Sequence, residues 1–386
     1  MLKKIVPAVF LLFVFSGCST EEKSPKENTS PDMEEHTPEE NDVSEDSEDD
    51  KEERSSKQAD EAFSEQTIAS SLNVPWAIQE HRDGFYVTER GGTIAHIDNN
   101  GKVDRQNVSL DKEVAEAGEG GLLGFQLAPD FRKSQKAYTY HTYEQNQNLA
   151  NRIVSITLEN GEWQESEVLL EAIPGGRIHN GGRLKIGPDD RLYATAGDAG
   201  NENQAQQLET LGGSILRMTL DGDIPEDNPI DDSYIYSYGH RNPQGISWNE
   251  EGALFSSEHG PSGHDEINRI EPGENYGWPE ITGNESQNGM RPPLSHSGND
   301  TWAPSGTAFD GTNDFYVTGL RGTQLMRFHV EEETMEVVYS GEGRLRDVLI
   351  AGDSMYVVTN NRDGRGNPDE EDDQLLKLEH FEEHVE

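Results

Sequence analysis

A pattern of three short strands recurs six times along this chain, and no other feature constrains the fold as strongly. Each copy opens on an apolar segment, crosses a polar turn into a segment that ends in small or polar residues, and finishes on an alternating segment. The copies span residues 76–98, 121–158, 182–220, 244–271, 306–330 and 346–379. Repeats of roughly 40–60 residues built from short strands are typical of propeller blades with four strands each. The chain is therefore predicted to be all-β, a six-bladed β-propeller of four-stranded antiparallel blades.

A propeller gathers the loops from one end of its strands around a central channel, so distant segments can share one pocket. A β-sandwich with irregular hairpins is the alternative fold, but it explains the repeated pattern less well. The propeller domain is expected to cover residues 63–386. The residues that fall at comparable strand ends or connections are His179, Asp198, Arg241, Gly260, Arg321 and Arg344.

The first 18 residues have the pattern of an export signal. Lys3 and Lys4 precede an apolar run over residues 5–15, which is too short to remain across a membrane because a spanning helix needs about 20 residues. Cys18, the only cysteine of the chain, ends the run in the small-residue setting of a bacterial lipobox. We expect acylation of Cys18 and lipid anchoring at the extracellular face of the cell membrane. An ordinary secretory signal with a chance cysteine is the alternative.

Residues 19–62 are acidic, low in complexity and almost free of apolar side chains. Such a composition cannot bury enough apolar surface to fold, so the segment is predicted to be a disordered tether. The acidity continues beyond the tether, and the whole chain carries a formal net charge of −44. This charge argues against nucleic acid as a partner, and membrane contact is expected only through the lipid anchor.

Three polar side chains stand in glycine-rich motifs far apart in the sequence. His179 lies in HNGGRL, Asp198 in ATAGDAG and Arg241 in GHRNPQG. A histidine is the usual general base near neutral pH, and a carboxylate beside it can orient it and stabilise its protonated form. A guanidinium can hold developing negative charge. A turn-capping histidine, an aspartate bonded to its own turn and a structural salt bridge are the respective alternatives.

An oxygen-rich patch follows in the segment EHGPSGHDEIN. Asp265, Glu266 and the backbone around Gly260 and Pro261 offer hard oxygen ligands without cysteine, so calcium is the expected cation. The segment NYGWP, which contains Tyr276, could close over the same site. A merely solvated acidic run is the alternative interpretation.

Three arginines interrupt this acidic sequence in its C-terminal part. Arg321 lies in GLRG, and Arg344 and Arg346 lie in GRLRD. If the propeller brings them to one channel, they can bind the carboxylates of an anionic ligand through paired hydrogen bonds. A surface ion pair is the alternative for each of them alone.

Taken together in this order, the motifs resemble the soluble pyrroloquinoline quinone (PQQ)-dependent glucose and aldose sugar dehydrogenases, the glucose/sorbosone dehydrogenase family. The resemblance extends from about residue 73 to about residue 378, and its motifs are GEGGLLGFQLAPDF, HNGGRL, GDAG, GHRNPQG, EHGPSGHDEIN, NYGWP, WAPSG and GRLRDV. It implies a six-bladed propeller that holds the quinone at its channel mouth, with calcium bridging the quinone to the protein. It also implies oxidation of an aldose at its anomeric carbon. Hydride would pass to the quinone, and electrons would leave to an unidentified acceptor.

The resemblance assigns roles through matching motif positions. It implies that His179 takes the sugar hydroxyl proton, that Asp198 supports this base, and that Arg241 faces the reactive quinone carbonyl. The residues implied to bind the quinone are Glu119, Asn242, Arg321, Arg344 and Arg346. The residues implied to bind calcium are Gly260 and Pro261 through backbone oxygens, and Glu266 and Tyr276, with Asp265 adjacent.

The chain departs from the glucose enzymes at three positions. Those enzymes have lysine where this chain has Arg321, aspartate where it has Ile178, and glutamine where it has Glu119. The last two differences favour the broader aldose dehydrogenases. Two other functions stay open: a non-redox, calcium-dependent propeller hydrolase such as a lactonase, and a binding propeller without cofactor. The arginines argue against the hydrolase, because a neutral lactone needs no such counter-charges.

Overall fold

The computed structural model describes residues 63–380, and these residues form an all-β structure. The helical elements within this range are the single turn α1 (Phe131–Ser134) and the 3-10 helix η1 (Glu202–Gln206). The predicted all-β fold is confirmed. The expected signal segment 1–18 with Cys18, the expected tether 19–62 and residues 381–386 lie outside the described range.

The largest sheet has eight strands in the order β2-β3-β4-β5-β9-β8-β7-β6. Two antiparallel runs of four strands make it up, and a short parallel pairing of Val108 with Trp163 and Ser109 with Gln164 joins them. The strands are β2 (Pro75–His81), β3 (Gly84–Glu89), β4 (Thr93–Asp98), β5 (Val103–Ser109), β6 (Leu122–Leu127), β7 (Lys136–Gln145), β8 (Asn148–Glu159) and β9 (Glu162–Pro174).

Three further sheets each contain four consecutive antiparallel strands. The first has β10 (Leu184–Ile186), β11 (Leu192–Ala196), β12 (Ser214–Met218) and β13 (Ile235–Tyr238). The second has β14 (Pro243–Trp248), β15 (Leu254–Glu258), β16 (Glu266–Ile270) and β17 (Ser295–His296). The third has β18 (Pro304–Phe309), β19 (Asp314–Gly319), β20 (Gln324–His329) and β21 (Thr334–Ser340).

The last sheet joins the two ends of the described chain. Its order is β1-β24-β23-β22, with β1 (Phe63–Ala69), β22 (Leu345–Ala351), β23 (Ser354–Thr359) and β24 (Leu375–His380). The antiparallel register of β1 with β24 runs from Phe63 opposite His380 to Ala69 opposite Leu375. The first folded strand is therefore the outermost strand of the last group.

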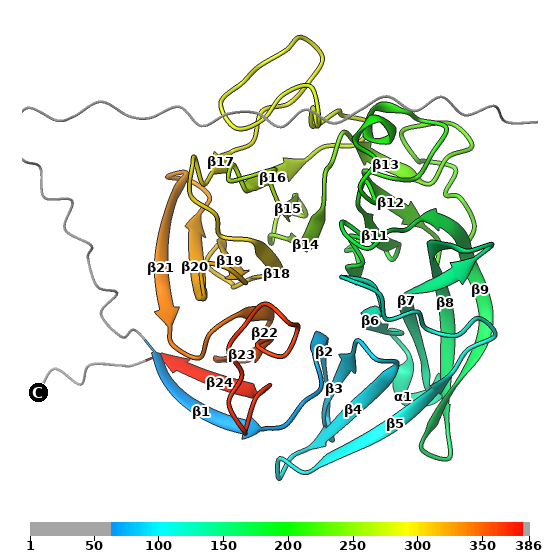
Figure 1. Cartoon of the computed structure of the whole chain (residues 1–386), viewed down its shortest axis with the longest axis vertical. Helices are drawn as coiled ribbons and strands as arrows, with labels where there is room; N and C mark the ends of the chain where they lie inside the picture. Colours follow the sequence, from blue (N-terminus) through cyan, green and yellow to red (C-terminus); the bar gives the residue numbers. More distant parts are fainter. Residues whose placement is uncertain (1–62, 381–386) are drawn as a thin grey trace, which may run out of the picture. The chain divides into compact units, whose positions relative to one another are not determined.

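The strand groups stand in a ring, and β2, β6, β14, β18 and β22 lie nearest its centre (Figure 1). Each sequence repeat supplies the first three strands of one group. These strands are largely buried, and β11, β12 and β15 are buried along their whole length. The outer strands β5 and β21 are mostly exposed, which explains why they carry no comparable apolar pattern. Within residues 63–380, no helix has the length and apolar character needed to cross a membrane.

A buried ion pair ties several central strands together. Arg183, just before β10, donates from Nη1 to Asp347 Oδ2 on β22 over 2.9 Å and from Nε to the Gln244 carbonyl on β14 over 2.8 Å. The same Asp347 oxygen accepts from the Ile78 backbone N–H on β2 over 2.9 Å. A Cβ at Gly306 on β18 would lie 1.9 Å from Asp347 Oδ1, so only glycine fits there. This ion pair positions the strand ends that carry the loops described below.

Candidate active site

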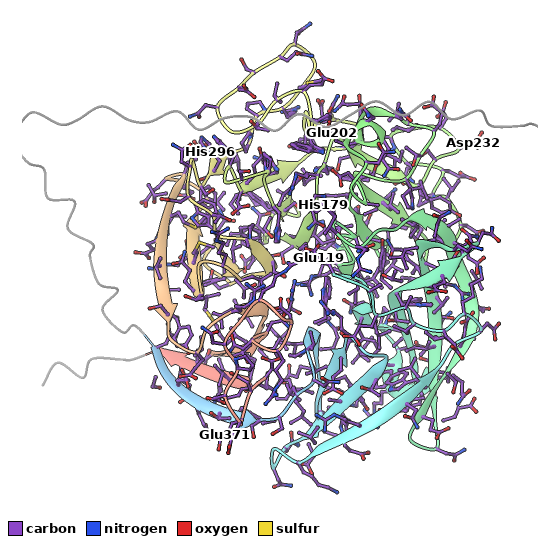
Figure 2. All side chains as sticks on the ribbon, in the orientation of Figure 1. Glu119, His179, Glu202, Asp232, His296 and Glu371 are labelled. Carbon is purple, nitrogen blue, oxygen red and sulfur yellow. The ribbon has the colours of Figure 1, made fainter. Side chains whose placement is uncertain are left out.

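The loops before β10, after β11, before β14 and after β15 meet at one end of the ring. Backbone hydrogen bonds connect them: Ala199 N–H to the His179 carbonyl over 3.1 Å and Asp198 N–H to the Arg241 carbonyl over 2.8 Å. Glu119, on the segment between β5 and β6, and His179 both lie near the centre of the ring (Figure 2). Segments distant in sequence therefore share one place, as the sequence predicts.

His179 and Asp198 form a hydrogen-bonded pair. His179 Nδ1 lies 2.7 Å from Asp198 Oδ1. Asp198 Oδ1 also accepts from the Gly200 N–H over 2.8 Å, and Oδ2 accepts from Trp278 Nε1 over 2.9 Å. Burial alone would raise the pKa of Asp198, but the bonds from His179, Gly200 and Trp278 outweigh it and lower the pKa. Asp198 is therefore a fixed carboxylate, and Nε2 is the nitrogen of His179 left to contact a ligand.

The backbone of His179 is held as tightly as its ring. The residue adopts a left-handed conformation with φ of 56°. Its N–H donates to Glu119 Oε2 over 3.0 Å. A Cβ at Gly197 would lie 2.1 Å from the His179 carbonyl oxygen, so glycine permits the close approach of the two loops. The neighbouring Ile178 is 42% exposed, an unusual apolar surface beside a polar pair.

Arg241 adjoins this pair through Trp278. Its guanidinium carbon lies 5.3 Å from the centre of the Trp278 ring, and Nη1 donates to the His259 carbonyl over 3.2 Å. Burial lowers the pKa of Arg241. Its Nε is buried and has no hydrogen-bond partner among the described residues. A buried guanidinium with an unused donor can receive an anionic oxygen.

Asn242 holds the same loops in place. Its side chain is buried, and its amide oxygen accepts from the Gly181 N–H over 3.1 Å. Its backbone carbonyl accepts from the His259 N–H over 3.3 Å. Asn242 thus joins the HNGGRL and EHGP segments next to Arg241.

Two carboxylates face each other beside Arg241. Glu258 on β15 lies opposite Glu266 on β16, and both line a small cavity with Gly260, Pro261 and Tyr276. Burial and the negative charges of Glu258 and Asp265 raise the pKa of Glu266 to about 8. A buried carboxyl group whose ionisation is disfavoured by nearby acids is a place where a cation is favourable.

The other predicted calcium ligands differ in what their atoms already contact. Among the described residues, none donates a hydrogen bond to the carbonyl oxygens of Gly260 and Pro261. The Tyr276 hydroxyl is engaged, because it donates to the Arg269 carbonyl over 2.6 Å and accepts from the Glu271 N–H over 2.8 Å. Any contact of Tyr276 with calcium would therefore have to use its backbone.

Asp265 is buried and saturated with hydrogen bonds. Its Oδ1 accepts from the Gly260 N–H over 2.9 Å. Its Oδ2 accepts from Thr301 Oγ1 over 3.0 Å, from the Trp302 N–H over 2.6 Å and from the Ala303 N–H over 2.8 Å. A carboxylate with four donors has little capacity left for a cation. The structure thus gives Asp265 a role in shaping the Gly260 loop, and its direct contact with calcium is the weakest of the predicted contacts.

No three His, Cys, Asp or Glu side chains in the described part of the chain gather closely enough to hold a metal ion alone. A calcium ion at Glu266 would therefore depend on backbone carbonyls, water or a bound ligand for its remaining oxygens.

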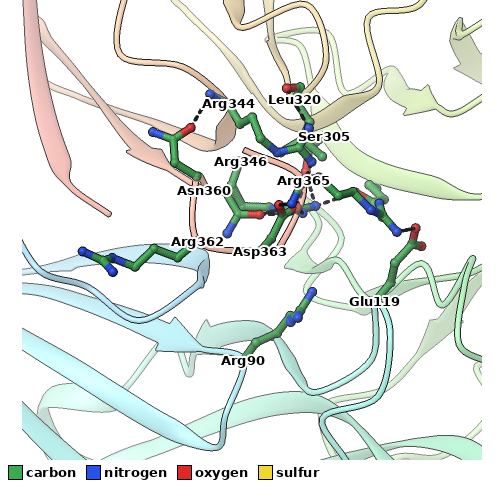
Figure 3. A network of polar contacts seen from close by, with 12 residues as sticks. Arg90, Glu119, Ser305, Leu320, Arg344, Arg346, Asn360, Arg362, Asp363 and Arg365 are labelled. Carbon is green, nitrogen blue, oxygen red and sulfur yellow. Dashed lines mark hydrogen bonds and ion pairs between the residues drawn. The ribbon is translucent and has the colours of Figure 1, made fainter. Parts of the chain in front are cut away.

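Several arginines gather around a second cavity (Figure 3), and His259 also lines this cavity. Arg346 is buried; it donates to Gln244 Oε1 over 2.8 Å and to Asn360 Oδ1 over 2.9 Å. Burial, with Arg344 and Arg90 nearby, lowers the pKa of Arg346 to about 9, although Asp363 opposes the shift. This positive group is unusual in a protein with such an excess of acids.

Arg344 and Arg321 line an adjacent hollow of about 420 Å³. Arg344 donates to the Leu320 carbonyl over 3.1 Å and to Asp363 Oδ2 over 2.8 Å, and its Nε is buried without a partner among residues 63–380. Arg321 is exposed at the rim of this hollow. The structure therefore brings Arg344 and Arg346 close to the channel and leaves Arg321 further out.

Sequence reasoning assigned no role to His259, Trp278, Glu258 or Arg365. His259 lines both the acidic cavity and the arginine cavity. Burial lowers its pKa to about 4, although Asp265 and Glu119 act in the opposite direction, so the ring is neutral. Its Nε2 is buried and has no partner in the described part. Two motifs could have indicated His259 and Trp278: EHGP contains His259 beside Gly260, and NYGWP contains Trp278 near Tyr276.

With this geometry in place, comparison with known proteins identifies the class of protein. The sequence matches the Glucose / Sorbosone dehydrogenase family over residues 72–376, so the chain belongs to that family. It is 30% identical to the aldose sugar dehydrogenase of Escherichia coli (strain K12) over 336 residues, which cover 78% of this chain and 90% of that protein. The predicted family resemblance is confirmed.

Two further relatives show how far the similarity extends. The chain is 34% identical to quinoprotein glucose dehydrogenase B of Acinetobacter calcoaceticus over 267 residues, 61% of this chain and 56% of that protein. It therefore spans little more than half the length of that relative. The solved PQQ-bound form of an aldose sugar dehydrogenase from Streptomyces coelicolor aligns with a TM-score of 0.77 and 37% identity, covering 83% of this chain and 98% of that chain.

Proposed function

We propose that this protein oxidises aldose sugars at the anomeric carbon with PQQ as cofactor. The observation that carries the proposal is the His179–Asp198 pair at 2.7 Å, with His179 Nε2 left for a ligand and Arg241 alongside. The names of the relatives support the same chemistry. We also propose that the strand groups are the blades of a six-bladed propeller, with β5–β9 pairing joining two blades.

The residues present fit an anionic, oxygen-rich quinone. Buried donor atoms of Arg241, Arg344 and Arg90 and the buried Nε2 of His259 lack partners in the described range. Unsatisfied buried groups of this kind are costly unless a ligand or water satisfies them. Arg344 and Arg346 would hold the carboxylates of the quinone, with Asn242, Glu119 and the outlying Arg321 near it. When bound, the quinone supplies the acceptor for the sugar's hydride.

His179 acts in this proposal as the base that removes the hydroxyl proton of the sugar. Its Nδ1 is directed at Asp198, so Nε2 takes the proton. The ionised Asp198 fixes the ring and stabilises the imidazolium that forms. Trp278 donates to the second oxygen of Asp198, and its ring lies against the Arg241 guanidinium. One residue therefore positions both the carboxylate that supports the base and the arginine. Arg241 stabilises negative charge that develops near it.

The proposal is tested by adding PQQ and calcium to the purified protein and supplying an aldose with an artificial electron-accepting dye. We expect the protein to acquire the absorbance of the quinone and to bleach the dye only when the aldose is present. Hydrolysis of a lactone without dye reduction would favour the hydrolase instead. Absence of any quinone uptake would leave a binding propeller and refute the proposed function.

We propose that calcium binds between Glu266 and the carbonyls of Gly260 and Pro261. Removing calcium with a chelator is expected to lower the melting temperature and to weaken quinone binding, because a ligand held only by the native state stabilises it. Glu266→Gln should weaken calcium binding in calorimetry, whereas the exposed Glu280→Gln should not. An unchanged melting temperature and unchanged quinone affinity after thorough chelation would remove calcium from the proposal.

We further propose that the protein is a lipoprotein anchored through Cys18 at the extracellular face of the cell membrane. The support is the sequence pattern that ends at Cys18. Cys18→Ala is expected to prevent lipid attachment, so the protein should leave the membrane fraction or remain unprocessed. The measurement is lipid labelling together with fractionation of cells. A variant as membrane-bound and as labelled as the original protein would contradict the anchor.

A further inference from the structure

Arg365 bridges two distant loops beside the arginine cavity. It lies between β23 and β24, and its Nη2 donates to Glu119 Oε1 over 2.7 Å, across 246 residues of sequence. Its backbone N–H donates to Asp363 Oδ1 over 2.9 Å, and Asp363 Oδ2 in turn binds Arg344. The loop between β23 and β24 is therefore anchored next to Arg344 and Arg346. The guanidinium group of Arg365 extends from this loop to Glu119 (Figure 3).

The cavity under this bridge is nearly closed. Its volume is about 10 Å³, enough for about one water molecule, and its charged lining is Arg90, Glu119, Arg346, Asp363 and Arg365. A ligand carboxylate can reach Arg346 here only if one lining side chain moves. The side chains of Arg346 and Asp363 are 6% and 2% exposed, but that of Arg365 is 52% exposed. Arg365 is therefore the lining group that is free to turn.

Glu119 occupies the place of an anion in this cavity. Three guanidinium groups line it against two carboxylates, and Asp363 is already bound by Arg344. Burial would raise the pKa of Glu119, but its bonds to the His179 N–H and to Arg365 lower the pKa, so it is ionised. Its two oxygens are used separately, since Oε2 accepts from His179 and Oε1 from Arg365. Release of Arg365 therefore leaves the contact with His179 intact.

We propose that Arg365 is a further ligand-binding residue, which exchanges Glu119 Oε1 for a carboxylate of the quinone cofactor when the cofactor binds. This inference rests on the proposed function. Glu119 then competes with the cofactor for Arg365. When no cofactor is bound, the contact with Glu119 holds the loop between β23 and β24 in place. Arg344 and Arg346 do not share this exchange of partner, because their guanidinium groups are buried and keep their protein partners, whereas the Arg365 side chain is 52% exposed.

The test measures the equilibrium Kd for PQQ by fluorescence titration in the presence of calcium, for the full protein and three variants. Glu119→Gln keeps an acceptor for His179 but removes the competing charge, and it should tighten Kd by roughly fivefold, the upper range for a partly exposed ion pair. Arg365→Gln should weaken Kd by about tenfold, as expected for a lost charge-assisted hydrogen bond. In the double variant, the effect of Glu119→Gln should shrink to less than about twofold, because its competitor is gone.

Two substitutions of the same charge type serve as controls. Arg132→Gln on α1 and Glu162→Gln at the start of β9 change exposed residues outside the cavity, and both should leave Kd unchanged. If the original protein binds the quinone and Arg365→Gln binds it with the same Kd, this inference is overturned and the proposed function stands. The inference is also overturned if Glu119→Gln lowers the Kd for PQQ equally in the original protein and in Arg365→Gln. No quinone binding by any form would overturn the proposed function and this inference with it.

Discussion

Replacing His179 by alanine is expected to leave the fold and the quinone affinity nearly unchanged while lowering turnover by roughly 10²–10⁴-fold, the usual contribution of a positioned general base. The expectation follows from the bond between His179 Nδ1 and Asp198, which leaves Nε2 as the proton acceptor. Turnover is measured with saturating quinone, calcium and aldose, and the fold is checked by circular dichroism.

Two variants separate this effect from others at the same site. Asp198→Asn should lose less turnover, since in the proposed mechanism Asp198 only orients His179 and stabilises its protonated form. Arg344→Ala should instead weaken quinone binding and recover partly in excess quinone, because the proposed function places Arg344 at a carboxylate of the cofactor. If turnover of His179→Ala stays within a few-fold of the original protein, the proton goes to another group and the proposed mechanism has to be abandoned.

Replacing Asp347 by alanine is expected to destabilise the protein by about 3–5 kcal/mol, the usual cost of leaving a buried charge without its partner. The variant leaves Arg183 buried among central strands and removes the acceptor of the Ile78 N–H. Chemical denaturation, followed by tryptophan fluorescence, measures the change in the free energy of unfolding.

The matched control is Asp83→Ala, because Asp83 is 80% exposed and its ion pair with His81 is long, at 3.9 Å. This control should change the free energy of unfolding by less than about 0.5 kcal/mol. An Asp347→Ala protein that unfolds at the same denaturant concentration as the control would show that the central ion pair contributes little.

The sequence was sufficient to predict the inner strands of the ring but not the outer ones. Inner strands such as β11 and β15 are buried on both faces, so their apolar runs stand out. Outer strands such as β5 and β21 are mostly exposed, and local pattern does not separate them from loops. The pairing of β1 with β24 was not predicted either, because register between the two ends of a chain leaves no local periodicity.

The candidate site divides in a similar way. Motifs placed His179, Asp198 and Arg241 together, and the structure connects them through hydrogen bonds and Trp278. A motif could not show that the Asp265 carboxylate is fully hydrogen-bonded. The sequence around an aspartate is the same whether its carboxylate accepts from backbone N–H groups or binds a cation. Arg365 was missed because its importance lies in a contact with Glu119, which is 246 residues away in the sequence. Contacts of this kind become visible only when the strands are placed in space.

The pairing of β1 with β24 sets a condition on how the protein can be made. β24 is translated after every other strand described here, while β1 is translated before them. Until residues 375–380 are available, β1 has no neighbour and β23 presents an open edge, and such edges pair readily with other chains. A protein shortened before residue 375 is therefore expected to aggregate rather than persist as a slightly smaller folded protein. The nascent chain therefore has to be kept from pairing with other chains until β24 has been synthesised.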